Sequence, residues 1–420
     1  MEITANKYSA WIGDFPEHWE VLRIKNLFQE MDSRSETGSE ELLSVSHYTG
    51  VTLKRESLEN EDDHLTNAAS LVGYKLVQQG DLVINIMLAW NGSLGISPHN
   101  GMTSPAYCVY RIKGNNNPEY FGYLFTTNLF KAEFRRHSTG IIDSRLRLYS
   151  DKFFSIFTVV PPKDEQDEIV QYIRGLEEKI NLFIQKKQRF IELLKEQRQG
   201  VIESAITYKV GWTKSRIKNI AKMFGRIGFR GYQTSDLVDE GEGAITISPS
   251  NMKHHKQMDF SNCSYLSWEK YEESPEIKIF ERDIIMVKTG ASYGKVAQVL
   301  GLPEKATINP QLMVFKEIFI DNDYFFYFLQ SGLIKEQMEK NVIGGTIPTI
   351  SQTKIGSFRL HYPNIEEQKQ IVSNIKTETV TIDTAIAKAE REIELIREYK
   401  EAMIAESVMG KRKVQTNFDK

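Results

Sequence analysis

The chain has 420 residues, which is too many for one ordinary hydrophobic core and predicts two or three domains. Its composition, 40% hydrophobic and 26% charged, is that of a folded soluble protein. The net charge of −3 argues weakly against a nucleic-acid partner, because strong DNA binders usually carry a basic excess.

Cysteine content and hydropathy indicate where the protein works. Cys108 and Cys263 cannot form a disulfide framework, and their spacing matches no metal cluster. No segment approaches the roughly 18–20 uninterrupted apolar residues of a membrane helix. The N-terminus lacks the basic, apolar and small-residue order of a signal peptide. We therefore expect a cytoplasmic protein that binds neither a membrane nor a metal.

The sequence repeats itself once. Residues 19–27 (WEVLRIKNL) match residues 212–220 (WTKSRIKNI), and residues 161–173 (PPKDEQDEIVQYI) match residues 363–375 (PNIEEQKQIVSNI). Three further matches lie between them in the same order: 75–84 with 277–286, 104–111 with 309–316, and 119–125 with 323–329. Five matches at nearly one offset indicate a duplicated unit of about 200 residues.

Each unit begins with a mixed α/β domain, predicted at residues 1–162 and 210–362. Short β-rich runs such as DLVINIM and DIIMVKT lie among turn-rich stretches, and helical patterns follow at residues 118–137 and 322–341. The first domain carries a net charge of −4, and residues 209–363 carry +3. The two domains therefore share a framework but differ in surface chemistry.

Each unit ends in a long helix, predicted at residues 163–209 and 363–412 and followed by a tail at 413–420. Asp164 and Asn364 are the expected N-caps, with acidic first turns that suit the helix dipole. Apolar residues then recur at spacings of four and three, which predicts an antiparallel coiled coil. The alternative, two unrelated core helices, would not share one heptad register. The expected seam comprises Ile169, Ile173, Leu176, Ile180, Phe183, Phe190, Leu194 and Val201 in the first helix, and Ile371, Ile375, Ile382, Ala385, Ala389, Ile396, Tyr399 and Met403 in the second.

Three polar clusters could contact DNA phosphates and base edges. Taken singly, each of these side chains is more often a solvated surface residue than a base contact, so they are better candidates as clusters. The first domain supplies Arg135, Arg136, Arg145 and Arg147 around Gly140, and the second supplies Ser248, Asn251, Lys253, His255 and Lys256, then Lys288, Ser292 and Lys295.

Three short motifs resemble catalytic or metal-binding motifs but lack residues that those motifs require. GASYGK has three residues between its glycines and no Ser or Thr after Lys295, so it is not a phosphate-binding P-loop. The segment Asn309-Pro310-Gln311-Leu312 lacks the second proline and the aromatic residue of an adenine methyltransferase pocket. The pair His254-His255 has no third metal ligand at a suitable spacing. We therefore predict no catalytic residue and no metal site in this chain.

Together these features resemble the specificity subunit of type I restriction–modification enzymes. The resemblance rests on WIGDFPEHWEVLRIKNLF at residues 11–28, on GDLVI at 80–84 with RDIIM at 282–286, and on the Pro-x-x-x-Glu-Gln starts at 161–166 and 363–368. It covers essentially the whole chain, and the order of the motifs is more specific than any one of them.

The resemblance implies a non-catalytic DNA-recognition subunit with two pseudo-twofold-related recognition domains joined by the two helices. Each domain would read one half of a split, asymmetric site in double-stranded DNA. The helices would set the spacer and dock two modification subunits, and restriction subunits would complete the complex. S-adenosylmethionine, ATP and Mg²⁺ are expected on those partners and not on this chain. The segment before Trp19 would pack near the end of the second helix. The alternative is a coiled-coil scaffold without sequence-specific DNA binding.

Overall fold

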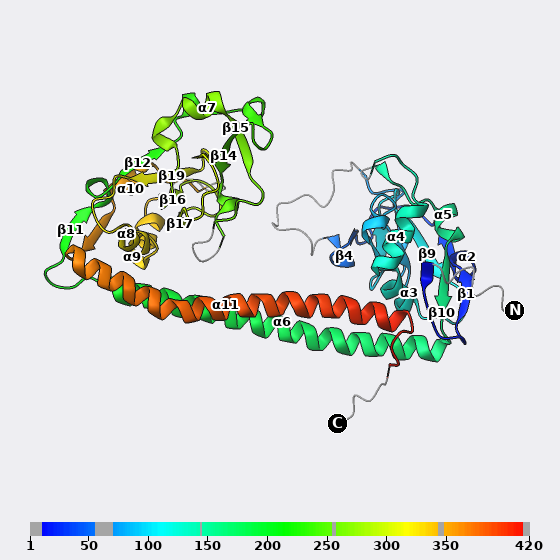
Figure 1. Cartoon of the computed structure of the whole chain (residues 1–420). Coiled ribbons are helices and arrows are strands. Elements are labelled where there is room, and N and C mark those ends of the chain that lie inside the picture. Colours follow the sequence, from blue (N-terminus) through cyan, green and yellow to red (C-terminus); the bar gives the residue numbers. More distant parts are fainter. Residues whose placement is uncertain (1–10, 55–69, 143–144, 254–257, 343–347, 415–420) are drawn as a thin grey trace. The chain divides into compact units, whose positions relative to one another are not determined.

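The computed structural model describes residues 11–54, 70–142, 145–253, 258–342 and 348–414. The chain divides into two compact units, Met1–Lys186 with Glu392–Lys420, and Lys187–Arg391 (Figure 1). Each unit contains one globular domain with parts of both long helices.

The first domain is built on a four-stranded antiparallel sheet with the strand order β2-β9-β6-β7. Two further pairs, β3-β4 and β5-β8, form smaller sheets, and β1 pairs with β10. The strands are β1 (Glu20–Arg23), β2 (Phe28–Met31), β3 (Leu43–Ser46), β4 (Gly50–Leu53), β5 (Lys75–Val77), β6 (Leu82–Ile84), β7 (Leu94–Ile96), β8 (Gly101–Thr103), β9 (Cys108–Ile112) and β10 (Phe157–Val160). The helices are α2 (Ile24–Leu27), α3 (Pro118–Phe125), α4 (Asn128–His137) and α5 (Ser150–Ser155).

The second domain repeats this sheet in the order β12-β19-β16-β17, and β11 pairs with β20 as β1 pairs with β10. It differs in having a second four-stranded sheet, β13-β15-β14-β18. Its strands are β11 (Thr213–Arg216), β12 (Lys222–Gly225), β13 (Leu237–Val238), β14 (Gly243–Ile247), β15 (Ser264–Ser267), β16 (Ile284–Val287), β17 (Val296–Gln298), β18 (Ala306–Ile308), β19 (Leu312–Lys316) and β20 (Arg359–Tyr362). Its helices are α7 (Trp268–Glu272), α8 (Asn322–Leu329), α9 (Gly332–Glu339) and α10 (Gln352–Ser357).

The helical patterns at 118–137 and 322–341 each form two helices and not one. Thr127 accepts a hydrogen bond from the backbone N–H of Phe130, and Ser331 does the same for Ile334, both at 3.4 Å. Each hydroxyl thus caps a new helix in the middle of a continuous apolar pattern.

The continuous apolar runs in the centre of each sheet are buried on both faces. In β16, Ile284 and Met286 join the core that contains the helices, whereas Ile285 and Val287 join a second core against the smaller sheet. Successive side chains point to opposite faces of the sheet, as in any strand, but here both faces pack against apolar residues. This explains why the sequence shows no polar alternation there.

The aspartate that precedes each central strand has a structural role. Asp81 accepts two hydrogen bonds from Arg111, at 2.8 and 2.9 Å, and Asp283 pairs with Lys316 at 2.7 Å. Each aspartate also accepts a backbone N–H three residues before it. The shared motifs GDLVI and RDIIM therefore fix the turn before the strand to the neighbouring strand.

The two long helices are α6 (Lys163–Ile206) and α11 (Ile365–Val408), each of 44 residues. Asn364 caps α11 as expected, since its side-chain oxygen accepts the N–H of Glu367 at 3.0 Å. Asp164 does not cap α6, because the helix begins one residue earlier and Asp164 lies in its first turn. In the described part of the chain, neither these helices nor any other has an apolar stretch long enough to cross a bilayer.

Each domain core contains the start of one long helix and the end of the other. The first core includes Ile169, Val170 and Ile173 of α6 together with Val408 and Met409 at the end of α11. The second includes Ile371, Val372 and Ile375 of α11 together with Ile202 and Ile206 of α6. Within each unit, therefore, α6 and α11 run in opposite directions against the same domain (Figure 1).

The Glu-Gln pair at each helix start locks this arrangement. Gln166 and Gln368 are 1% and 2% exposed. Each donates to the carbonyl of the proline five residues earlier, Pro161 or Pro363, at 2.9 and 2.8 Å. The Gln166 oxygen accepts the N–H of Asn117 at 2.7 Å, and the Gln368 oxygen accepts that of Asp321 at 2.8 Å. Because Asn117 and Asp321 cap α3 and α8, one glutamine joins three elements.

The preceding glutamate binds the tryptophan that begins each domain. Trp19 donates to Glu165 at 2.9 Å, and Trp212 donates to Glu367 at 3.3 Å. The short motifs that define the repeat are thus the two ends of one hydrogen-bonded joint between domain and helix.

The far end of each helix is held by a domain side chain. The Tyr120 hydroxyl donates to the carbonyl of Val408 at 2.8 Å, and His361 Nε2 lies 2.8 Å from the carbonyl of Ile206. These carbonyls have no partner inside the helix, so the bonds satisfy groups that burial would otherwise orphan. Burial lowers the pKa of His361, which favours the neutral ring.

The segment before Trp19 packs as the resemblance implies. Ile12 is 1% exposed and belongs to the same core as Val408 and Met409. Pro16 and Trp19 lie so close to Gly410, which has a φ of +67°, that a Cβ there would stand 2.4 Å from Pro16. Only glycine fits this approach, which lets the N-terminal segment and the end of α11 meet.

The predicted coiled-coil seam was wrong at its aromatic positions. Phe183, Phe190 and Tyr399 are 37%, 45% and 47% exposed. The buried positions are instead Ile191, Arg198, Thr379, Ile386 and Ile393, with Ile184 partly buried. The error was one residue of register, because large aromatic residues on a neighbouring face were assigned to the seam.

Ion pairs join the two helices within each unit. In the first unit Lys400 lies 2.9 Å from Glu177, and in the second Arg198 lies 2.7 Å from Asp383. Arg198 and Lys400 occupy equivalent positions of the repeat, but their acidic partners do not. Both units therefore have an ion pair between α6 and α11, but the position of the acidic partner differs by one helical turn between them.

We expect Gln368→Leu to lower the free energy of unfolding by about 2–4 kcal/mol, because the Asp321 N–H and the Pro363 carbonyl would lose their buried partner. Chemical denaturation checks this. Gln370→Leu, an exposed glutamine on the same helix, is the matched control and should change stability little. Equal losses for both variants would contradict the role given to Gln368.

Candidate nucleic-acid interface

The arginines predicted in the first domain fall into two groups. Arg135 and Arg136 end α4, where Arg136 forms a two-pronged hydrogen bond with the buried carboxylate of Glu133 and Arg135 lies over the ring of Trp90. His137 is also 3.0 Å from Glu133. Arg136 is thus held in place, and it shapes the end of α4.

Arg145 and Arg147 lie on a turn that follows α4. Thr139 and Arg147 exchange two backbone hydrogen bonds of 2.9 and 3.0 Å, which close the turn. Arg145 is exposed beside Gly140, and Ile141 at the same turn is 99% exposed. Residues 143–144 lie outside the described residues. The structure therefore brings an exposed arginine and an exposed apolar side chain to one surface turn.

The second predicted cluster is a loop organised by Asn251. This residue is 4% exposed, and its amide oxygen accepts hydrogen bonds from the backbone N–H and hydroxyl of Ser248, both at 2.9 Å. Its amide nitrogen donates to the Asp259 carbonyl at 3.0 Å. Asn251 therefore positions the loop rather than presenting its side chain at the surface. His254, His255 and Lys256 lie outside the described residues.

Lys253 is the exposed cation of this loop and pairs with Asp259 at 3.1 Å. Hydrogen bonds from Ser261 and the charge of Lys253 lower the pKa of Asp259 to about 2. Lys295 reaches the same loop, because its ammonium group donates to the carbonyl of Met252. Burial and the nearby charge of Lys253 lower the pKa of Lys295. Two of the predicted clusters thus meet at this loop.

Lys288 and Ser292 belong to the turn after β16. Gly290 and Gly294 adopt φ angles of +108° and +84°, which glycine allows at little cost. Ser292 is exposed at this turn. The Lys288 backbone bonds to Gln311 at 2.8 Å and to Ile350 at 3.0 Å. GASYGK is therefore a strand-end turn tied to two other segments.

Two residues beside Lys288 were not predicted. A Cβ built on Gly225 would stand 3.1 Å from Gln352 Nε2 and 3.2 Å from Lys288 Nζ. Gln352 Nε2 is buried and has no hydrogen-bond partner among the described residues. The repeat offers a signal for these residues, because it aligns Lys288 with Ile86 and Gln352 with Ser150 at one offset, and both alignments replace one residue type with another.

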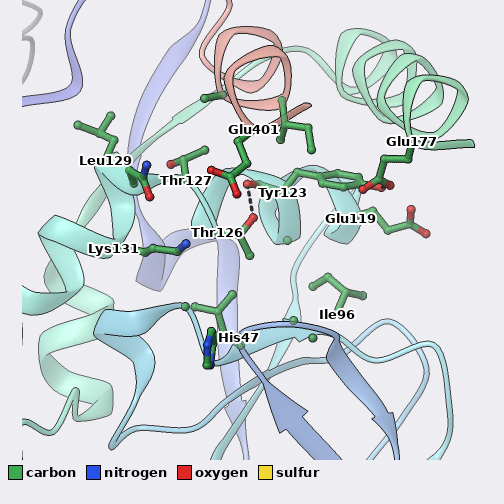
Figure 2. Close-up of a pocket in the computed structure, with 18 of the residues that line it drawn as sticks. His47, Ile96, Glu119, Tyr123, Thr126, Thr127, Leu129, Lys131, Glu177 and Glu401 are labelled. Carbon is green, nitrogen blue, oxygen red and sulfur yellow. Dashed lines mark hydrogen bonds between the residues drawn. The ribbon is translucent and has the colours of Figure 1, made fainter. Parts of the chain in front are cut away.

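A large cavity of about 1350 Å³ lies in the first unit, between the domain and the end of α11 (Figure 2). Tyr123 on α3 donates to Glu177 of α6 at 2.7 Å, and the nearby Arg174 pairs with Glu119. Lys131 and Glu401 also face the cavity. Its walls thus carry both signs of charge, several already paired. Nowhere among the described residues do three or more His, Cys, Asp or Glu side chains gather as metal ligands would.

Comparison with a protein family places these features in context. Residues 209–395 match the family described as "Type I restriction modification DNA specificity domain". The matched segment covers the second domain and most of α11.

Similar full-length proteins carry the same description. The chain is 23% identical over 435 residues to the type I restriction enzyme MjaVIII specificity subunit of Methanocaldococcus jannaschii, covering 96% of this chain and 95% of that protein. It is 22% identical to the putative type I restriction enzyme MjaX specificity subunit of the same organism, covering 96% of each.

A solved chain shares the fold. That chain comes from a structural study of complex assembly and conformational transition in a type I R-M system. It superposes with a TM-score of 0.65 at 12% identity, covering 95% of this chain and 100% of that one.

We expect Asn251→Ala to raise amide hydrogen-exchange rates across residues 248–263 and to cost about 2 kcal/mol of stability, because buried loop groups lose their partners. Hydrogen exchange followed by mass spectrometry checks this. Ser292→Ala, which removes an exposed hydroxyl, should leave both quantities unchanged. Normal exchange in the Asn251 variant would show that the loop holds itself without that amide.

Proposed function

We propose that this chain is a specificity subunit of a type I restriction–modification system and that its two globular domains read the two parts of one split DNA site. The first domain reads one half and the second reads the other. The half-sites differ in sequence, since the domains share framework bonds but not the side chains around them.

One observation carries this proposal. The Trp–Glu, Glu-Gln and Asp–Arg/Lys joints recur in both domains, yet the second sheet and the surface loops differ. A scaffold without a recognition role would have no need to keep the frame and vary the surface. The exposed or partly exposed cations Arg145, Lys253 and Lys288 lie in this variable part and are suited to phosphates and base edges.

The long helices serve two roles in the proposal. They set the length of the DNA spacer, and they dock two modification subunits. Exposed apolar side chains support docking: in the first unit Leu182 of α6 is 51% exposed and Leu395 of α11 is 47% exposed, and in the second unit Leu193 of α6 is 46% exposed. Apolar residues on an outward face indicate a partner surface when they gather along a helix.

Catalysis is proposed to reside in the partners. The modification subunits would bind S-adenosylmethionine and methylate adenine, and restriction subunits would use ATP and Mg²⁺. This chain would bind double-stranded DNA and none of those cofactors, and it would act in the cytoplasm. The competing proposal, a helical scaffold that binds no specific DNA sequence, predicts methylation that is independent of the two domains.

Exchange of one domain tests the proposal. We expect that replacing residues 212–362 with the equivalent domain of another specificity subunit changes one half of the methylated motif. The first half and the spacer length should stay the same, because α6 and α11 are retained. Sequencing of methylated genomic DNA in cells that co-express the modification subunit provides the measurement.

The reciprocal exchange of residues 19–160 is the matched control and should alter only the other half. Methylation at any site reports that the chimera has folded and assembled. An unchanged motif after both exchanges would refute the recognition role, and a changed spacer would refute the spacing role of the helices.

A further inference from the structure

The two domains differ in chemistry at one place where their backbones are the same. In the first domain the N–H of Leu148 donates to the carbonyl of Ile86 at 2.9 Å. In the second the N–H of Ile350 donates to the carbonyl of Lys288 at 3.0 Å. Both bonds join a residue one or two positions after a central strand to the segment that enters a six-residue helix, α5 or α10.

The first domain satisfies its side chains at this place internally. Ser150, the first residue of α5, has its hydroxyl 3.0 Å from the hydroxyl of Tyr110, and Ile86 is apolar. The hydroxyls of Ser150 and Tyr110 are thus paired with each other. These side chains therefore need no hydrogen bond from a ligand.

The second domain leaves hydrogen-bond donors without acceptors. Gln352 replaces Ser150 as the first residue of its helix, and Phe315 replaces Tyr110 in the strand register, so the hydroxyl partner is lost. Gln352 Nε2 is buried and unpaired among the described residues. Gln352 Nε2 lies 3.1 Å, and Lys288 Nζ 3.2 Å, from the one position that a Cβ on Gly225 would take. Burial lowers the pKa of Lys288, as expected of an ammonium group without a carboxylate close by.

Two hydrogen-bond donors cannot bond to each other, and a buried donor without a partner is costly. A ligand that brings two adjacent acceptors would relieve both. In DNA the major-groove edge of guanine offers such a pair, O6 and N7, whereas adenine presents one acceptor and one donor. A phosphate also offers acceptors, but a contact to phosphate carries no sequence information, so the two kinds of contact predict different effects of substitution on the methylated motif.

We propose that Lys288 and Gln352, seated over Gly225, form the guanine-reading pair of the second domain. This inference rests on the proposed function and names residues that set specificity within it. Lys288 swings outward from Gly225 when DNA enters, which lets Gln352 and Lys288 donate to the same base. The first domain reads no base with the equivalent residues, because Ile86 has no donor and Ser150 is already bonded.

The first domain supplies the variant that tests the pair. Lys288→Ile with Gln352→Ser installs the residues found at the equivalent positions of the first domain. In cells that co-express the modification subunit, we expect the methylated motif to lose its preference for guanine at one position of the second half-site, by about tenfold. The first half-site and the spacer should remain unchanged. Lys354→Ile, an exposed lysine on the same helix, removes the same charge and should leave the motif intact.

The outcomes separate the possible explanations. An unchanged motif would overturn the inference, and so would a weaker methylation of all sites with a smaller salt dependence, because that pattern marks a phosphate contact. If the double variant methylates nothing, Gln352→Ser alone decides, since it keeps the lysine and removes the orphaned amide; loss of all methylation there would also count against the pair. Domain exchange that alters the motif while this variant does not would refute only the inference, whereas exchange without effect would refute the proposed function.

Discussion

The structure depends on the burial of each long helix at both of its ends. A helix of 44 residues leaves backbone groups unpaired at its termini, and its apolar end residues need a core that the helix cannot provide. The first domain receives the beginning of α6 and the end of α11, although about 250 residues separate Val408 from the nearest strand of that domain. The second domain receives the opposite ends. Each domain therefore folds around parts of the chain that belong to both halves of the repeat.

This constraint explains which residues the duplication has kept. Trp19, Glu165 and Gln166 have counterparts in Trp212, Glu367 and Gln368, and both sets bond the start of a domain to the start of a helix. Away from that joint the domains diverge, in the second sheet, in the loops and in the side chains beside the central strand. A conserved frame with divergent surfaces fits the proposal that the two domains read different parts of one DNA site.

The sequence predicted the order of the elements well, and the repeated motifs marked the residues of the joint, but it did not predict that the two motifs contact each other. It failed where one-dimensional patterns cannot separate faces or caps. The heptad pattern placed Phe183, Phe190 and Tyr399 in the seam, since their size suggested burial, whereas Ile184, Ile191 and Ile386 point inward. The patterns at 118–137 and 322–341 hid the caps at Thr127 and Ser331, because a hydroxyl within an amphipathic run looks like a surface residue.

The structure exposes some of the predicted DNA-contact residues and buries others, for a related reason. A residue type suited to DNA is also suited to holding a loop, and only the structure separates Asn251, which is buried and fully bonded, from Lys253, which is exposed. The repeat aligns Gln352 with Ser150, but the sequence could not show that the Gln352 amide lacks a partner, because this depends on Phe315 and Lys288, which are distant in the chain. These contact assignments remain predictions, and the experiments described with them decide each one.

The most direct test of the account is amide hydrogen exchange on Val408→Ala, a change at the last residue of α11. If the end of α11 is part of the first domain's core, exchange should accelerate across residues 19–160, far away in sequence, while residues 213–362 stay protected. Ile206→Ala, the equivalent change in α6, should instead affect residues 213–362. Faster exchange confined to the last turn of α11, with the first domain unaffected, would contradict the claim that each domain is completed by the end of the other helix.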